Sequence, residues 1–90
     1  MKKIKINNFE IGNSLPFVLI AGPCALESRD HALMMVEKIM EITDNLKLNF
    51  IYKTSFDKAN RTSINSNRGL GLDKALKIFE EIKIKYKCPI

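Results

Sequence analysis

The chain lacks the features that define several large classes of protein. Its two cysteines, Cys24 and Cys88, are too few for a disulfide framework and do not have zinc-finger spacing. Their scarcity favours a reducing, cytoplasmic location. No apolar run approaches the length that spans a bilayer, so we expect no membrane partner. Polar residues also interrupt the region between the basic start and Cys24, which argues against a lipoprotein export signal.

A glycine-rich nucleotide motif and a basic composition typical of nucleic-acid binding are also missing. The net charge is +5, but 12 of the 15 basic residues are lysines scattered along the chain, and we expect no nucleic-acid partner. No G-x-G-x-x-G follows the first strand-like run, which disfavours a dinucleotide fold, and we expect no organic cofactor. With 46% hydrophobic and 28% charged residues, the composition is that of a folded globular chain.

Two short patterns and two continuous runs predict strands. Alternating apolar residues around Asn7-Asn8 suggest a hairpin within residues 1–14. Residues 16–21 form an apolar run without polar alternation, which is typical of a strand buried on both faces of a parallel sheet. Gly22-Pro23 ends that strand, and residues 48–52 read as a second one.

Helical spacing of apolar residues predicts a helix after each of these two strands. Ser28 is a candidate N-cap for the first helix, and Asp44-Asn45 should end it. The second helix should run from about Leu72 to Tyr86. The expected apolar faces are Ala32, Leu33, Val36, Ile39, Met40 and Ile42 in the first, and Leu72, Ala75, Leu76, Phe79 and Ile82 in the second. Residues 88–90 look like the approach to a third strand.

The order strand, helix, strand, helix predicts an α/β fold with parallel strands and helical crossovers. The two strands start about 32 residues apart, a spacing found in (β/α)₈ barrels and in doubly wound sheets alike. Two strands and two helices cannot cover both faces of a parallel sheet. We therefore expect the chain to be part of a larger protein or to assemble with other chains.

Two unusual segments should meet at the carboxyl ends of the parallel strands, where active sites of such folds lie. Cys24 follows the first strand, and a segment rich in cations and hydroxyl groups, residues 52–63, begins at the end of the second. Lysine and arginine side chains suit phosphate and carboxylate groups. We expect an anion-binding catalytic site here. The plainer alternatives are a solvated loop and, for Cys24, a small buried core residue.

The three runs that carry this chemistry resemble a known family. Residues 20–30 (IAGPCALESRD), 53–61 (KTSFDKANR) and 66–72 (SNRGLGL) closely resemble the amino-terminal third of 3-deoxy-D-manno-octulosonate 8-phosphate synthases. The resemblance implies a (β/α)₈ TIM barrel with an amino-terminal hairpin, usually a homotetramer. On this basis residues 1–14 would be the hairpin, and residues 15–90 the first two βα units of an incomplete barrel domain.

The resemblance also implies an activity and a set of substrate-binding residues. Such enzymes are transferases that condense phosphoenolpyruvate with arabinose 5-phosphate, release phosphate, and supply lipopolysaccharide synthesis. By resemblance, Lys53, Ser55 and Lys58 belong to the phosphoenolpyruvate pocket. Asn60 would contact the sugar hydroxyls, and Arg61 would bind the sugar phosphate in a neighbouring subunit's site.

Two further positions carry implications from the resemblance. Thr62 stands where the family usually has serine, so the hydroxyl is kept. Family members with cysteine at the position of Cys24 depend on a metal, whereas those with asparagine do not. The resemblance thus implies a divalent metal (zinc, ferrous iron or manganese), and a thiolate suits the softer of these ions. The remaining ligands and any certain catalytic residue would lie outside these 90 residues, and His31 matches no family ligand.

Two other hypotheses remain. Heptulosonate 7-phosphate synthases, which use erythrose 4-phosphate, share the Gly-Pro-Cys element, but they typically read Lys-Pro-Arg-Thr where this chain reads Lys58-Ala59-Asn60-Arg61. A non-catalytic remnant is the third hypothesis, since Ile90 falls where a third strand should begin. Under each of the three hypotheses, we expect the 90 residues alone to be inactive.

Overall fold

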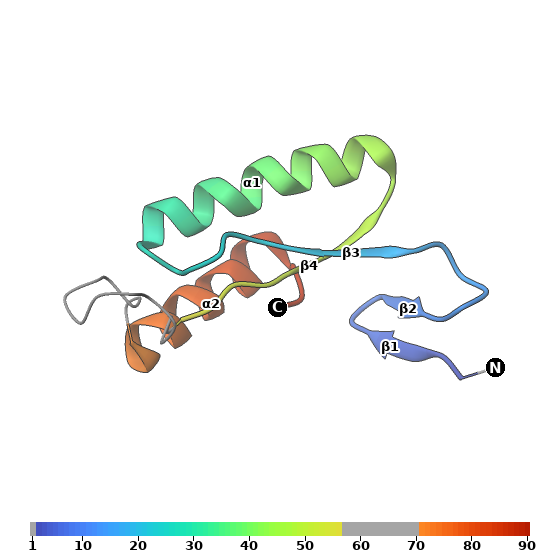
Figure 1. Cartoon of the computed structure of the whole chain (residues 1–90), viewed down its shortest axis with the longest axis horizontal. Helices are drawn as coiled ribbons and strands as arrows, with labels where there is room; N and C mark the ends of the chain where they lie inside the picture. The colour runs from blue at the N-terminus through green and yellow to red at the C-terminus, as the bar shows by residue number, and fades with distance from the viewer. Residues whose placement is uncertain (1, 57–70) are drawn as a thin grey trace.

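The computed structural model describes residues 2–56 and 71–90. A small hairpin is followed by two strand–helix units, and Figure 1 shows the hairpin beside the amino-terminal end of the first of them. The structure confirms the predicted α/β class, with a hairpin followed by two strand–helix units. The division between residues 14 and 15 stays a prediction.

The hairpin forms where alternation predicted it. Strands β1 (Ile4–Ile6) and β2 (Phe9–Ile11) pair antiparallel, with Ile4 opposite Ile11 and Ile6 opposite Phe9. Asn7 occupies the turn with a φ of 50°. Asparagine tolerates this left-handed conformation better than most residues, which accounts for its presence at the turn.

The two longer runs form a parallel pair. Strand β3 (Val18–Ala21) lies beside β4 (Asn49–Tyr52), in a register from Val18 opposite Asn49 to Ala21 opposite Tyr52. The parallel arrangement confirms the prediction from alternating elements. The first strand begins at Val18 rather than at residue 16, and Pro16, which has no N–H, could not have donated a hydrogen bond to the ladder.

Helix α1 (Arg29–Leu46) connects these strands, as a parallel crossover requires. The predicted cap is confirmed, since Ser28 Oγ accepts a hydrogen bond from the backbone N–H of His31 at 3.0 Å. The predicted end at Asp44-Asn45 is slightly early. The helix continues to Leu46 and closes at Lys47, which adopts a left-handed conformation and donates its N–H to the carbonyl of Asp44.

Helix α2 (Leu72–Tyr86) has the predicted bounds, but its buried face only partly matches the predicted apolar face. Leu72 and Leu76, expected on that face, are each 54% exposed. The buried residues of this helix are Ala75, Ile78 and Ile82. In α1, Ile42 is likewise exposed, while Thr43 is buried and donates its hydroxyl to the carbonyl of Met40.

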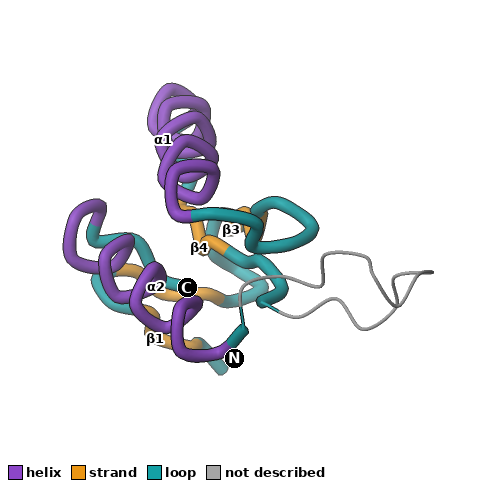
Figure 2. The backbone as a smooth tube through the Cα atoms, turned by 90° about the vertical axis from the view of Figure 1, so that its left-hand side faces the viewer, coloured by secondary structure: helices purple, strands orange, loops and turns teal. Residues whose placement is uncertain are grey.

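One core of buried side chains joins both helices to the strand pair, and Figure 2 shows the backbone of α1 and α2 beside β3 and β4. The side chains of Phe50 and Tyr52 belong to this core. The buried cluster is Leu26, Ala32, Leu33, Val36, Phe50, Tyr52, Ala75, Ile78, Ile82 and Cys88.

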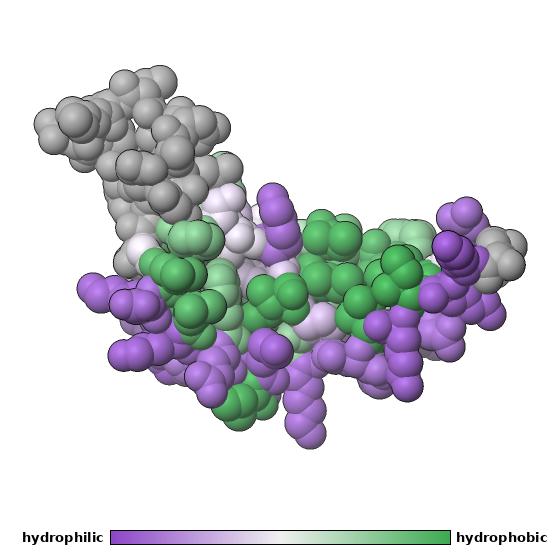
Figure 3. All heavy atoms as spheres, turned by 90° about the horizontal axis from the view of Figure 1, so that it is seen from below, coloured by the Kyte–Doolittle hydropathy of each residue, from purple (hydrophilic) through white to green (hydrophobic). Residues whose placement is uncertain are grey.

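Apolar surface remains open elsewhere, as expected for a strand pair without further neighbours. Ile20 is 59% exposed and Phe17 67%, and Figure 3 shows hydrophobic surface gathered along one face of the molecule. At the carboxyl terminus, Tyr52 donates its backbone N–H to the carbonyl of Pro89 at 2.9 Å. Residues 88–90 therefore run beside β4, where the sequence predicted the approach to another strand.

Candidate functional site

The segments that follow β3 and β4 remain joined beyond the ends of the strands. We call these segments, residues 22–28 and 53–56, the carboxyl edge. Lys53 donates its N–H to the carbonyl of Ala21 at 2.9 Å, and Leu26 donates its N–H to the carbonyl of Ser55 at 2.7 Å. Ala25 and Ser55 form a parallel bridge. The predicted meeting of the two unusual segments is thus present.

Gly22 allows a close approach of the two backbones within the carboxyl edge. A Cβ atom added to Gly22 would lie 1.9 Å from the carbonyl oxygen of Lys53, a distance that no side chain can accept. The glycine is required by this backbone contact. It also explains why the Gly-Pro-Cys run begins with glycine.

Three of the seven candidate site residues fall within the described chain. The thiol of Cys24 and the side chain of Lys53 are exposed, and Ser55 is half-buried in the paired segments. The exposure of Cys24 is unlike that of Cys88, which is buried, so Cys24 is not a core residue. The other four candidates, Lys58, Asn60, Arg61 and Thr62, lie outside the described residues.

A second cation, Arg29 at the start of α1, already forms ion pairs with carboxylates. Arg29 donates from Nε to Glu81 Oε1 at 2.7 Å, its Nη2 also contacts Glu81, and its Nη1 contacts Asp30 Oδ1 at 3.1 Å. The hydrogen bonds and charge of Glu81 raise the pKa of Arg29, and Arg29 lowers the pKa of Glu81 in return. Among the described residues of the carboxyl edge, Lys53 is therefore the cation best placed to meet an anion.

Thr54 is a residue of this site that sequence reasoning did not single out. Its Oγ1 donates to the carbonyl oxygen of Pro23 at 2.8 Å, across 31 positions of the chain. The hydroxyl between Lys53 and Ser55 was visible in the sequence. Its partner was not, because that contact depends on the register of the two segments.

The described residues do not form a complete metal site. Residues 2–56 and 71–90 contain no group of three histidine, cysteine, aspartate or glutamate side chains that could hold an ion. The exposed thiol of Cys24 fits one ligand position, since a thiolate must reach the ion directly. Any further ligands would have to come from residues beyond those described.

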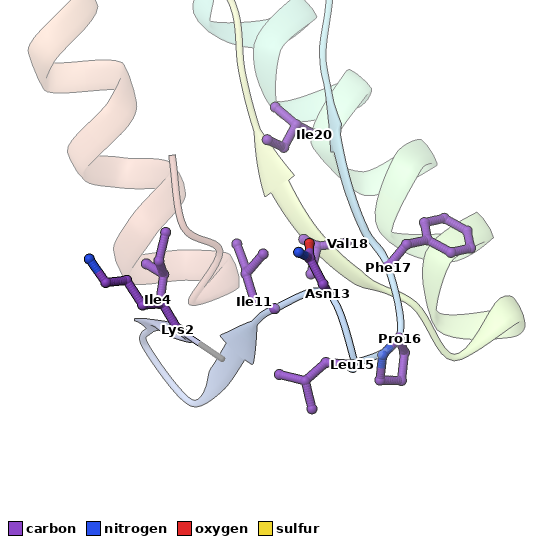
Figure 4. A pocket seen from close by; sticks show the side chains of 10 residues that line it. Lys2, Ile4, Ile11, Asn13, Leu15, Pro16, Phe17, Val18 and Ile20 are labelled. Atoms are coloured by element: carbon purple, nitrogen blue, oxygen red, sulfur yellow. The ribbon is translucent and has the colours of Figure 1, made fainter.

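A hollow in the described structure lies away from this chemistry. It encloses about 630 Å³ between the hairpin and β3. Figure 4 shows Ile4, Ile11 and Leu15 around it, with Val18 and Ile20 on the adjoining strand. Its lining is mostly aliphatic and lacks the clustered cations that a phosphorylated substrate requires. We therefore do not assign it as the active site. No described helix is long and apolar enough to cross a membrane.

Comparison with known proteins identifies the family of the chain. Residues 2–90 match the DAHP synthetase I family, and the chain belongs to that family.

Curated relatives within it carry a more specific name. The chain is 60% identical over 91 residues to 2-dehydro-3-deoxyphosphooctonate aldolase of Rickettsia prowazekii, and 58% identical over 89 residues to the protein of that name in Rickettsia felis. The matches cover 100% and 99% of this chain but 33% and 32% of the relatives. The chain thus spans about a third of their length, and the resemblance to the amino-terminal third of such an enzyme is confirmed.

Proposed function

We propose that the complete protein carrying this chain condenses phosphoenolpyruvate with D-arabinose 5-phosphate and water. The products would be 3-deoxy-D-manno-octulosonate 8-phosphate and phosphate. The observation that carries this proposal is the pairing, at the carboxyl edge, of the segment that carries Cys24 with the segment that carries Lys53 and Ser55. The names of the relatives support it, since they denote an aldolase of this octulosonate phosphate.

The chemistry requires a site that neutralises charge and orients two anions. Carbon 3 of the enol would attack the aldehyde carbon of the sugar, while water adds at carbon 2. The resulting intermediate would lose phosphate by cleavage of its carbon–oxygen bond. The ammonium of Lys53 and the hydroxyl of Ser55 can bind the carboxylate or phosphate of phosphoenolpyruvate. Lys58, Asn60, Arg61 and Thr62 are proposed to complete the substrate contacts. Holding the two substrates close together and correctly oriented would supply most of the remaining rate enhancement.

Cys24 is proposed as one ligand of a divalent ion (zinc, ferrous iron or manganese). Such an ion, when bound, would polarise an oxygen of a substrate or water. We expect Cys24→Ser to lower the metal content of the purified complete protein. Equal metal content in the variant and the parent would remove Cys24 from the proposal.

The proposed reaction can be tested by product analysis on the complete protein. Purified enzyme is supplied with phosphoenolpyruvate and either arabinose 5-phosphate or erythrose 4-phosphate, and phosphate release and product mass are measured. An octulosonate phosphate formed only from the five-carbon sugar supports the proposal. Preference for the four-carbon sugar would favour the heptulosonate synthase instead. No product from either sugar would favour a non-catalytic remnant.

The contribution of Lys53 can be isolated with a matched pair of variants. Lys53→Ala should lower kcat/KM by about 10²–10³-fold, because a cation that meets substrate charge is lost from the site. Lys5→Ala removes an exposed lysine on β1 and serves as the control for the change in net charge. Equal kinetics in the two variants would exclude the proposed role of Lys53.

The assembly and cellular role follow from the same proposal. A homotetramer would cover the apolar surface that the described residues leave open, together with the rest of the barrel. We place the enzyme in the cytoplasm, in the synthesis of lipopolysaccharide. Mass measurement of the native complex would test the tetramer.

A further inference from the structure

The pairing of the two strands changes register within the carboxyl edge. In β3 and β4, Ala21 lies opposite Tyr52, whereas beyond the strands Ala25 lies opposite Ser55. Residues 22–24 thus face only residues 53 and 54, and the first segment carries one extra residue. Such a bulge re-aims the side chains within it and leaves some backbone groups without ladder partners. Cys24 lies in this bulge.

Thr54 compensates for the disrupted ladder. Pro23 has no N–H to satisfy, but its carbonyl oxygen still needs a donor. Thr54 Oγ1 supplies one at 2.8 Å, and the contact is partly buried. The bulge is therefore fixed on both sides and at its centre. Lys53 bonds to Ala21 before it, Leu26 bonds to Ser55 after it, and Thr54 bonds to Pro23 within it.

We propose that Thr54 is a positioning residue which, through the carbonyl of Pro23, fixes the thiol of Cys24 relative to Lys53 and Ser55. Pro23 is bonded directly to Cys24, and its ring restricts its own φ. Holding the Pro23 carbonyl therefore orients the peptide group that leads into Cys24. The inference rests on the proposed function, because the orientation of the thiol matters only if the thiol binds a ligand such as a metal ion.

The test uses two substitutions in the complete protein. Thr54→Val keeps the shape of the side chain and removes the donor, whereas Thr54→Ser keeps the donor and removes a methyl group. The first readout is hydrogen exchange of the peptide that covers residues 22–28. We expect exchange to rise about three- to tenfold in Thr54→Val, as the loss of one hydrogen bond permits, and to stay near the parent rate in Thr54→Ser.

The second readout is the binding of Co²⁺, followed by the thiolate absorption that Cys24 would give. We expect the affinity for Co²⁺ to fall about tenfold in Thr54→Val and to recover in Thr54→Ser. Helix α2 and the buried thiol of Cys88 report on the overall fold, and we expect both to stay protected in each variant. A general loss of protection in Thr54→Val, with no selective effect at residues 22–28, would count against positioning.

The outcomes separate this inference from the proposed function. If the parent protein shows no Co²⁺–thiolate absorption, the metal proposal for Cys24 fails, and hydrogen exchange still decides whether Thr54 fixes the bulge. If the parent binds Co²⁺ through Cys24 and Thr54→Val binds it equally well, the positioning of the thiol is overturned. Unchanged exchange at residues 22–28 would overturn the inference whatever the metal does.

Discussion

The two ends of the β3–β4 pair are built on opposite principles. At the carboxyl edge, backbone hydrogen bonds and a close glycine contact hold two segments together and present a thiol, a lysine and hydroxyl groups. At the amino-terminal end, the hairpin and β3 surround an open hollow lined mostly by aliphatic side chains. At the carboxyl edge, hydrogen bonds restrict the conformation of the backbone. Beside the hairpin, the exposed apolar surface can be covered by other protein surfaces.

This contrast separates the site proposed for substrate binding from the apolar surface proposed for assembly. Polar groups fixed by backbone geometry can orient a substrate, because their positions do not depend on the packing of flexible side chains. Aliphatic surface is non-directional and tolerates changes in its partner. Perturbations of the carboxyl edge should therefore be more severe than similar perturbations beside the hairpin.

The largest expected effect comes from Gly22→Ala. The new Cβ would collide with the carbonyl of Lys53, which is backbone and cannot move aside cheaply. We expect the free energy of unfolding to fall by about 3 kcal/mol or more, measured by denaturant or thermal unfolding of the complete protein. Gly12→Ala is the matched control beside the hairpin. Its Cβ would lie 3.3 Å from Cγ of the flexible Lys3 side chain, so we expect a loss below about 1 kcal/mol. Equal losses would remove the contrast between the two ends.

We expect alkaline pH to lower the free energy of unfolding by an intermediate amount, through two buried groups of the core beneath the carboxyl edge. Burial raises the pKa of Tyr52 to about 12 and also raises the pKa of the Cys88 thiol. An acid whose pKa is raised by folding stabilises the fold below its unfolded pKa and loses this contribution as the pH rises. Stability should thus decline above about pH 8.5 for the thiol and above about pH 10 for the phenol, by up to about 1.4 kcal/mol per pH unit for each group.

Two variants test which group causes the loss of stability at alkaline pH. Cys88→Ala should flatten the first part of the curve of unfolding free energy against pH, and Tyr52→Phe the second. Tyr86, whose pKa desolvation also raises to about 12, should keep part of the decline in both variants. A curve that neither substitution changes would show that the alkaline loss arises elsewhere.

The smallest effect is expected from the ion pair between the two helices. Arg29 and Glu81 are both partly exposed, so water and salt screen their attraction. Glu81→Gln should lower the thermal midpoint slightly at low salt, and the difference should vanish near 1 M salt. The pKa of Glu81 is lowered by Arg29, so the contribution is present above the ordinary carboxyl range and disappears as the pH falls through the folded pKa. A loss as large as that of Gly22→Ala would contradict the exposed character of the pair.

Local chemistry made much of the fold predictable. The Ser28 cap, the Asn7 turn and the order of strands and helices follow from short-range preferences, and the structure confirms them. The face of α2 was not predictable in the same way. Leu72 and Leu76 have the same helical spacing as buried residues, and only the direction from which β4 and α1 approach leaves them exposed.

The residues of the candidate site also divide into those that the sequence predicted and one that it did not. Residue type and position after two strands predicted Cys24 and the segment that contains Lys53 and Ser55, since the carboxyl ends of parallel strands meet. The individual roles of Lys53 and Ser55 came from the family resemblance. Thr54 was not identified, because the contact between its hydroxyl and the Pro23 carbonyl depends on the pairing of two segments 31 residues apart, next to the bulge. A bulge of this kind has no local signature in the sequence that distinguishes it from an ordinary loop.

By itself, the sequence determined which segments become strands and helices, and which residues bring charge and a thiol to the strand ends. These depend on side-chain type, spacing and backbone preference, which act over a few residues. The tertiary structure alone decided that a Cβ at Gly22 would strike Lys53, that Thr54 would bond to Pro23, and that one face of α2 rather than another would be buried. Those outcomes depend on the register and packing of segments about 30 or more residues apart, which exist only when the chain is folded.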